Sequence, residues 1–143
     1  MVTQRVALVV DGNTPDRVNT ALLLEAAGYQ VRSARSFDEA KALLAAERPH
    51  LLVTDLRLGQ YNGIHLVLRS RSDYPGIIAV VTSRIADPVL EAEVHRQNAR
   101  FLLRPLTGPQ LLAAIAASVA EGVVEPPPVT GETPAVAQAP LNP

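Results

Sequence analysis

The sequence contains no cysteine, and aromatic residues make up only 3% of its 143 residues. Without cysteine, neither a disulfide framework nor a thiolate metal site can form. The scarcity of aromatic residues means that the core must be built from Leu, Val, Ile and Ala. Apolar residues make up 48% of the chain, which is enough for one ordinary globular domain.

The chain also lacks an excess of charge and a long hydrophobic run. Its formal net charge is −1, which argues against a surface that binds nucleic acid through bulk positive charge. No apolar run approaches the length that spans a membrane. The first residues, MVTQRVALVV, lack the pattern of a secretory signal peptide. We therefore expect a cytoplasmic protein that binds neither nucleic acid nor a membrane through this chain.

The composition changes sharply near Gly122. The segment VVEPPPVTGETPAVAQAPLNP holds half of the prolines of the chain and has neither helical nor strand periodicity. We expect residues 1–122 to form one domain and residues 123–143 to be a proline-rich disordered tail or a linker. A linker would imply a further domain beyond it.

Upstream of Gly122, strand-like and helix-like segments alternate. Apolar runs predict strands over residues 6–10, 29–34, 51–55, 76–83 and 101–103. Prolines, capping residues and apolar spacing predict helices that start at Pro15 and end near Gly28, and over residues 37–48, 63–70, 88–98 and 109–121. In the first helix, the apolar residues Val18, Leu22 and Ala26 recur every four positions.

Alternating strands and helices predict a parallel sheet that is covered by helices on both faces. Residues 6–10, 51–55 and 76–83 are continuously apolar, as in central strands, whereas residues 29–34 are mixed, as in an edge strand. With right-handed crossovers, this favours an α/β fold with a doubly wound five-stranded sheet of order 2-1-3-4-5. In such sheets the functional crevice lies beyond the carboxyl ends of the strands.

Polar residues stand at these carboxyl ends. Asp11 follows the first strand, Asp55 ends the third, Thr82 lies at the end of the fourth, and Arg104 follows the fifth. The first and third strands should be neighbours, and two nearby carboxylates repel unless a cation lies between them. Mg²⁺ suits this place because it uses one or two carboxylates and keeps waters for a phosphate. A hydroxyl and a fixed positive charge complete a set that suits phosphoryl transfer.

This ordered set resembles the receiver domains of two-component response regulators over residues 5–121. An acid follows the first strand, the pattern D-L-R-L-x-x-x-x-G surrounds the end of the third, Thr or Ser ends the fourth, and a basic residue with Pro follows the fifth. The resemblance implies a flavodoxin-like receiver fold. It implies a phosphoryl group from a sensor histidine kinase or a phosphotransfer protein, a downstream protein partner, and no enzymatic activity beyond self-phosphorylation and autodephosphorylation.

The resemblance also implies where phosphate and metal would bind. Asp55 would accept the phosphoryl group. Asp55, Asp11 and the backbone carbonyl of Arg57 would hold Mg²⁺. Thr82 would hydrogen-bond the phosphoryl group and shift towards it, and Arg104 would occupy the place of the family's lysine.

The resemblance further implies a switch that acts at a distance from the phosphate. Phe101 stands where the family carries its switching aromatic residue, and it would respond together with Thr82. Their change would alter the surface made by the fourth helix, the fifth strand and the fifth helix. That surface would dock a partner or a second copy of the chain.

The sequence departs from the family pattern at three positions. Gly12 stands where the family usually has a second, metal-binding acid, so Mg²⁺ should bind more weakly; Asn13 is a conceivable substitute ligand. Arg104 replaces the family's lysine, and its guanidinium is longer than the lysine ammonium, planar and forked. It would pair with Asp55 before phosphorylation, or with both Asp55 and a phosphoryl oxygen. Gly59 replaces a common proline, which should loosen the loop after Asp55.

Three alternatives stay open from the residues alone. The changes at Gly12 and Arg104 are also consistent with a pseudo-receiver, a protein-binding module that is not phosphorylated. The stretch DGNT resembles the D-x-D-x-T start of haloacid-dehalogenase-type phosphatases, but Asn13 replaces the second acid and no cap domain is evident. A flavodoxin-like cofactor carrier would need a phosphate loop after the first strand, where Asp11 would repel phosphate.

Overall fold

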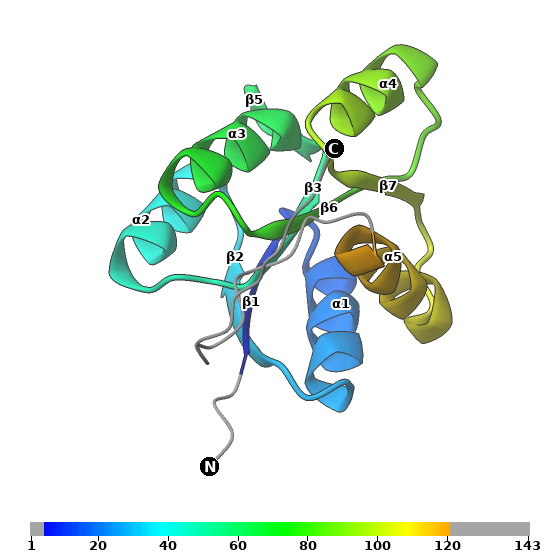
Figure 1. Cartoon of the computed structure of the whole chain (residues 1–143). Helices are drawn as coiled ribbons and strands as arrows, with labels where there is room; N and C mark the ends of the chain where they lie inside the picture. The colour runs from blue at the N-terminus through cyan, green and yellow to red at the C-terminus, as the bar shows by residue number, and fades with distance from the viewer. Residues whose placement is uncertain (1–4, 121–143) are drawn as a thin grey trace, which may run out of the picture.

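Five parallel strands form the central sheet of the computed structural model, which describes residues 5–120 (Figure 1). They are β1 (Val6–Val10), β2 (Gln30–Ala34), β3 (Leu51–Asp55), β6 (Ile78–Ser83) and β7 (Arg100–Leu103). Their order in the sheet is β2-β1-β3-β6-β7. Counted within this sheet, the order is the predicted 2-1-3-4-5, so the doubly wound fold is confirmed. The predicted tail or linker at residues 123–143 lies outside the described residues.

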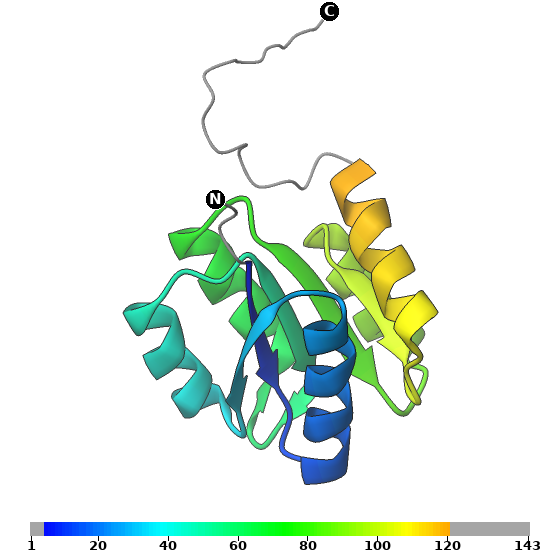
Figure 2. The same cartoon turned by 90° about the horizontal axis from the view of Figure 1, so that it is seen from below.

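Helices cover both faces of the sheet. They are α1 (Thr14–Ala26), α2 (Phe37–Ala46), α3 (Gly63–Asp73), α4 (Pro88–Arg96) and α5 (Gly108–Ala120). The helices α1 and α5 pack on one face, while α2, α3 and α4 pack on the other (Figures 1 and 2). No helix in the described part of the chain is long and apolar enough to cross a membrane.

Strand residues alternate between the two cores, as the pleat requires. On β1, Leu8 and Val10 belong to the core beneath α2, α3 and α4, whereas Ala7 and Val9 belong to the core beneath α1 and α5. All five residues of β1 are buried. The unbroken apolar run that predicted a central strand therefore arises because helices cover both faces.

The helix α1 starts where the sequence predicts, but it buries a different face. The side chain of Asn13 caps it by accepting a hydrogen bond from the backbone N–H of Asp16, and Pro15 lies in its first turn. Its buried residues are Thr20 and Leu24. The apolar stripe of Val18, Leu22 and Ala26 faces solvent, with Val18 49% and Leu22 58% exposed.

The segment after Asp55 forms a small antiparallel hairpin that sequence patterns did not predict. Its strands are β4 (Arg57–Leu58) and β5 (Tyr61–Asn62). Gly59 lies in the turn with a φ of 65°, a conformation that glycine adopts without strain. The Tyr61 ring stacks on Phe37 of α2 with 4.3 Å between the ring centroids. The glycine closes a hairpin, and a ring contact holds that hairpin against α2; the greater looseness expected of glycine compared with proline stays a prediction.

Candidate functional site

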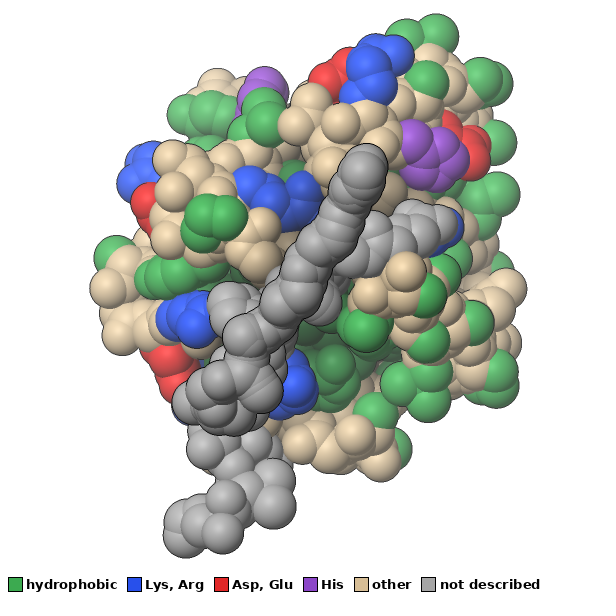
Figure 3. Space-filling model, viewed as in Figure 1, with side chains coloured by type: hydrophobic (Ala, Val, Ile, Leu, Met, Phe, Trp, Pro, Cys, Tyr) green, Lys and Arg blue, Asp and Glu red, His purple; other side chains and the backbone are tan. Residues whose placement is uncertain are grey.

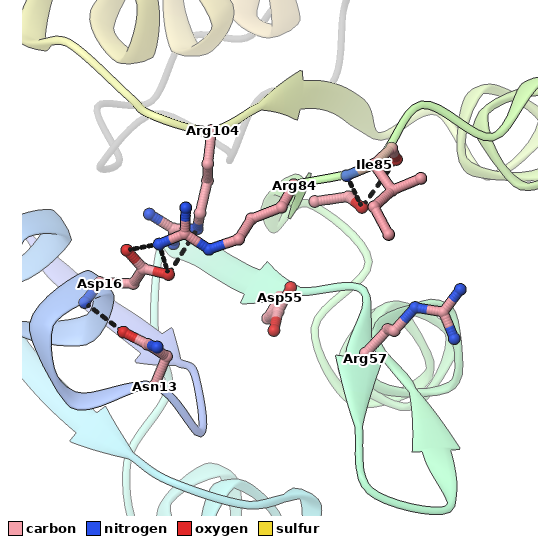
Figure 4. Close-up of a pocket in the computed structure, with 8 residues that line it drawn as sticks. Asn13, Asp16, Asp55, Arg57, Arg84, Ile85 and Arg104 are labelled. Carbon is pink, nitrogen blue, oxygen red and sulfur yellow. Dashed lines mark hydrogen bonds and ion pairs between the residues drawn. The ribbon is translucent and has the colours of Figure 1, made fainter.

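A cavity of about 290 Å³ opens at the carboxyl ends of the sheet strands (Figure 4). Its lining comes from the ends of β3, β6 and β7 and the residues after them, from the start of α1, and from β4: Asn13, Asp16, Asp55, Arg57, Ser83, Arg84, Ile85 and Arg104. Of the predicted site residues, Asp55, Arg57 and Arg104 line this cavity. Asp11 and Thr82 are buried at the neighbouring strand ends, with 1% and 0% exposure.

Asp55 is a half-buried carboxylate at the end of β3. Its register partner on β6 is Thr82, and the Leu56 N–H donates a 2.8 Å hydrogen bond to the Thr82 carbonyl. Burial raises the pKa of the Asp55 carboxyl above its ordinary value, and the charge of Asp11 raises it further. The backbone N–H of Arg57 and the charge of Arg104 act in the opposite direction. The carboxylate is thus poorly solvated and lies close to cationic and N–H groups.

A close backbone approach explains the glycine in D-L-R-L-x-x-x-x-G. Gly63 begins α3, and its N–H donates a 2.7 Å hydrogen bond to the Leu56 carbonyl. A Cβ atom on Gly63 would lie 2.4 Å from the Asp55 carbonyl oxygen and 3.0 Å from Thr54 Cγ2. The helix can therefore start this close to Asp55 only without a side chain at residue 63.

Thr82 presents a hydroxyl that has no hydrogen-bond partner within residues 5–120. The residue is fully buried, and an unsatisfied buried hydroxyl costs free energy. By contrast, the neighbouring Ser83 hydroxyl donates to the Ile85 carbonyl and accepts from the Ile85 N–H. An oxygen-rich ligand on Asp55 would give Thr82 the partner that it lacks.

Both carboxylate oxygens of Asp11 are already engaged by the chain. Oδ1 accepts a 2.8 Å hydrogen bond from the Asn13 N–H, and Oδ2 lies 2.9 Å from Nη2 of Arg104. Burial raises the pKa of Asp11, while the Asn13 N–H and the Arg104 charge act to lower it. The side chains of Asp11 and Arg104 are 1% and 3% exposed, so this ion pair is buried.

The ion pair of Arg104 differs from the predicted pair with Asp55. In the described residues its guanidinium pairs with Asp11, and Nη2 also donates a 3.2 Å hydrogen bond to the Thr20 hydroxyl. Its Nε lies 3.9 Å from Oδ2 of Asp16 and makes no hydrogen bond in this part of the chain. The site therefore holds three buried polar atoms without a hydrogen bond in the described residues: the Thr82 hydroxyl, the Arg104 Nε–H, and Oδ2 of Asp11, which contacts Arg104 only as an ion pair.

Asp16 and Arg84 complete the site and were missed from the sequence. Nη2 of Arg84 lies 2.5 Å and 2.6 Å from the two carboxylate oxygens of Asp16. Figure 4 shows the guanidinium groups of Arg84 and Arg104 meeting at Asp16. Charges of opposite sign thus alternate from Asp11 through Arg104 and Asp16 to Arg84. Their positions in the sequence could have indicated them, because Asp16 lies in the first turn of α1 and Arg84 directly follows Ser83 at the end of β6.

The predicted Mg²⁺ site keeps only part of its ligand set free. Residues 5–120 contain no group of three or more His, Cys, Asp or Glu side chains that could hold a metal ion. Asp11 is held by Arg104, and the side-chain oxygen of Asn13, the conceivable substitute ligand, accepts from the Asp16 N–H. Asp55 and the Arg57 carbonyl are the predicted ligands that remain.

Phe101 lies away from the cavity. It is half-buried on β7, pairs in register with Val81, and packs against the core beneath α2, α3 and α4. The predicted docking surface corresponds to α4, β7 and α5. Figure 3 shows hydrophobic side chains exposed over α4 and α5. Among the exposed hydrophobic residues of these two helices are Val89 on α4, 75% exposed, and Leu112 on α5, 46% exposed.

Comparisons with protein families and with curated proteins indicate the same family. The model of the response regulator receiver domain matches residues 7–116. The chain is 35% identical over 106 residues to a response regulator receiver protein of Anaeromyxobacter sp. (strain Fw109-5), covering 73% of this chain and 44% of that protein. It is 31% identical over 125 residues to the photosynthetic apparatus regulatory protein RegA of Cereibacter sphaeroides, covering 87% and 66%. The chain spans less than half the length of the first of these relatives.

Solved structures have the same fold. A CheY-like response regulator receiver domain protein from Methanospirillum hungatei JF-1 matches with a TM-score of 0.75 and 23% identity, covering 83% of this chain and 96% of that one. A response regulator protein from Burkholderia pseudomallei matches with a TM-score of 0.73 and 27% identity, covering 84% and 74%. That crystal structure carries a phosphorylated aspartic acid, a calcium ion and citrate.

Proposed function

The chain belongs to the response regulator receiver domains of two-component systems, and from this premise we propose that Asp55 receives a phosphoryl group. Receiver domains are generally signalling modules rather than enzymes, and they interact with histidine kinases or phosphotransfer proteins. One observation carries the proposal: Asp55 faces a cavity, and two hydrogen-bond donors beside it, the Thr82 hydroxyl and the Arg104 Nε–H, are buried without a hydrogen bond in the described residues. We propose a sensor kinase or a phosphotransfer protein as the donor.

The proposed step uses groups of this chain. A carboxylate oxygen of Asp55 attacks the phosphorus atom of the donor, and the leaving group departs with the electron pair of the broken bond. The Thr82 hydroxyl and the guanidinium of Arg104 donate to the phosphoryl oxygens as charge builds up on them. Receiver domains generally bind Mg²⁺ in this pocket. Because Asp11 is engaged by Arg104 here, no step of the proposal depends on that ion.

The proposed output passes from Thr82 through the sheet to the surface of α4, β7 and α5. Thr82 pairs in register with Leu102 on β7, and Phe101 lies next to it in sequence. A shift of Thr82 towards the phosphoryl group would therefore act on the strand that carries Phe101. We propose that this surface docks a downstream protein or a second copy of the chain in the cytoplasm.

Phosphorylation can be tested with a small donor. We expect wild-type protein incubated with acetyl phosphate to gain the mass of one phosphoryl group, and the Asp55→Asn variant to gain none. Asp38→Asn is a suitable control because Asp38 lies in the first turn of α2 and does not line the cavity. Equal labelling of wild type and Asp55→Asn would contradict the proposal.

The engagement of Asp11 by Arg104 favours one second candidate, a pseudo-receiver that binds its partner without phosphorylation. In that case wild-type protein would gain no phosphoryl group from acetyl phosphate or from a kinase. Partner binding would then be the same for wild type and Asp55→Asn.

A further inference from the structure

The charge balance of the pocket differs from that of a site built around a divalent cation. The carboxylates of Asp16 and Asp55 line the cavity and Asp11 is buried at the neighbouring strand end, while the guanidinium-bearing residues Arg57, Arg84 and Arg104 also line the cavity. Each negative charge is thus matched by a fixed positive one. Mg²⁺ is bound through one or two carboxylates, and in this pocket the three carboxylates are balanced by three guanidinium groups.

We propose that the guanidinium of Arg104 takes the place of the divalent cation, so that Asp55 accepts a phosphoryl group without Mg²⁺. The phosphorylation part rests on the proposed function above. The guanidinium lies where a cation would contact Asp11, with Nη2 2.9 Å from Oδ2 of that acid, and its Nε is 3.9 Å from Asp16, which is not a predicted metal ligand. Its charge also acts on Asp55.

The forked shape of arginine makes this replacement possible. A lysine ammonium is a compact point charge, whereas a guanidinium directs several N–H groups in one plane. Arg104 uses one nitrogen for Asp11 and Thr20 and keeps its Nε–H without a hydrogen bond. That Nε–H is therefore available to a phosphoryl oxygen while the guanidinium continues to neutralise Asp11.

The chemical step balances without a metal ion. With acetyl phosphate as donor, an Asp55 carboxylate oxygen forms a new bond to phosphorus, and the bond between phosphorus and the acetyl oxygen breaks. Acetate leaves with that electron pair, and the aspartyl phosphate retains the two negative charges of the phosphoryl group. No proton has to be supplied, and the added charge is met by Arg104 and Arg84.

Gly12 makes the proposal testable by a gain of function. Its backbone is not in the left-handed region, and a Cβ atom there would meet only the Arg35 carbonyl oxygen, at 3.6 Å. The backbone at residue 12 therefore accepts a Cβ atom at ordinary van der Waals distance. Gly12→Asp adds the missing carboxylate, and Gly12→Asn is the matched variant with nearly the same shape and no charge.

The first measurement is a titration of the unphosphorylated full chain with Mg²⁺, in which binding is detected through the backbone amide signals in NMR spectra. We expect the amide signals of residues 11–13 and 55–57 to stay in place in wild type and Gly12→Asn at millimolar Mg²⁺. In Gly12→Asp they should shift in a saturable way. Arg104→Lys should also gain Mg²⁺ binding, because a lysine cannot hold Asp11 and Asp16 together. Wild-type shifts that saturate as readily as those of Gly12→Asp would overturn the proposal.

The second measurement is the rate of phosphorylation by acetyl phosphate with Mg²⁺ and with EDTA. We expect the wild-type rates to agree within about twofold, whereas a metal-dependent site should lose roughly tenfold or more in EDTA. A wild-type loss of that size would overturn the proposal. If wild type gains no phosphoryl group in either condition, the proposed function fails, and the NMR titration still decides whether Arg104 occupies the cation's place.

Discussion

Arg104 and Asp11 form a buried ion pair, with 2.9 Å between Nη2 and Oδ2 and side chains that are 3% and 1% exposed. It links the loop after the last sheet strand to the end of the first. Because the pair is shielded from water, loss of one partner would leave the other charge buried and uncompensated. The pocket therefore depends on Arg104 for stability as well as for charge.

Replacement of Arg104 by methionine should destabilise the fold by about 3 to 5 kcal/mol, the usual cost of an uncompensated buried charge. Urea unfolding followed by circular dichroism measures this directly. Arg35→Met is the control, because the ion pair of Arg35 with Glu39 is exposed on the surface and its loss should change stability little. Similar urea midpoints for the two variants would contradict the structural role of Arg104.

Replacement of Thr82 by valine should have opposite effects on stability and on signalling. Valine has the same shape and removes a buried hydroxyl that has no partner, so the free energy of unfolding should rise by about 1 kcal/mol. The same variant should hold less phosphoryl group at steady state with acetyl phosphate, because one donor to the phosphoryl oxygens is lost.

Thr54→Val is the matched control for that variant. Thr54 is equally buried, but its hydroxyl donates a 3.0 Å hydrogen bond to the Asp55 carbonyl. Its loss should cost about 1 kcal/mol. If both valine variants are destabilised alike, the Thr82 hydroxyl has a partner in the folded protein.

Replacement of Asp55 by asparagine should stabilise the protein at neutral pH. Burial and Asp11 raise the pKa of Asp55 in the folded chain above its ordinary value of 3.8, so the ionised carboxylate opposes folding. As the pH falls through the raised pKa, wild type gains a proton in the folded state and recovers stability. The difference in urea midpoint between Asp55→Asn and wild type should therefore shrink on acidification. A difference that widens towards acid pH would contradict this sign.

Replacement of Gly59 by alanine should cost roughly 1 kcal/mol, because an L side chain is strained at its φ of 65°. Gly12→Ala is the control, since residue 12 has no positive φ and a Cβ atom there would lie at an ordinary van der Waals distance of 3.6 Å from the Arg35 carbonyl oxygen. Thermal unfolding of both variants checks the difference. Equal melting temperatures would show that the hairpin turn can relax into another conformation.

Most of the fold followed from patterns that are local in sequence. The continuously apolar run of β1 predicted a strand buried on both faces, and alternation with helices left few topologies. The face of α1 could not be predicted, because its exposed side carries Val18 and Leu22 while its buried side includes Thr20, a polar partner of Arg104. The strands β4 and β5 have two residues each, too few for any periodicity to appear.

The candidate site was likewise predictable from the sequence only in part. The strand-end positions of Asp55 and Arg104 followed from the order of the motifs. The choice of Asp11 as the partner of Arg104 depends on side-chain geometry that spacing does not encode. The contact between Asp16 and Arg84 joins residues 68 positions apart, from a helix turn and a loop that packing brings together.

The stack of Tyr61 on Phe37 gives the chain a natural optical probe. The sequence has no tryptophan and three tyrosines, so its intrinsic fluorescence comes from tyrosine alone. Tyr61 lies on the hairpin that follows Asp55; the residue is 39% exposed, and its ring stacks on Phe37. Any event at Asp55 that moves this hairpin would change the emission of Tyr61, and it could be followed in real time without a label.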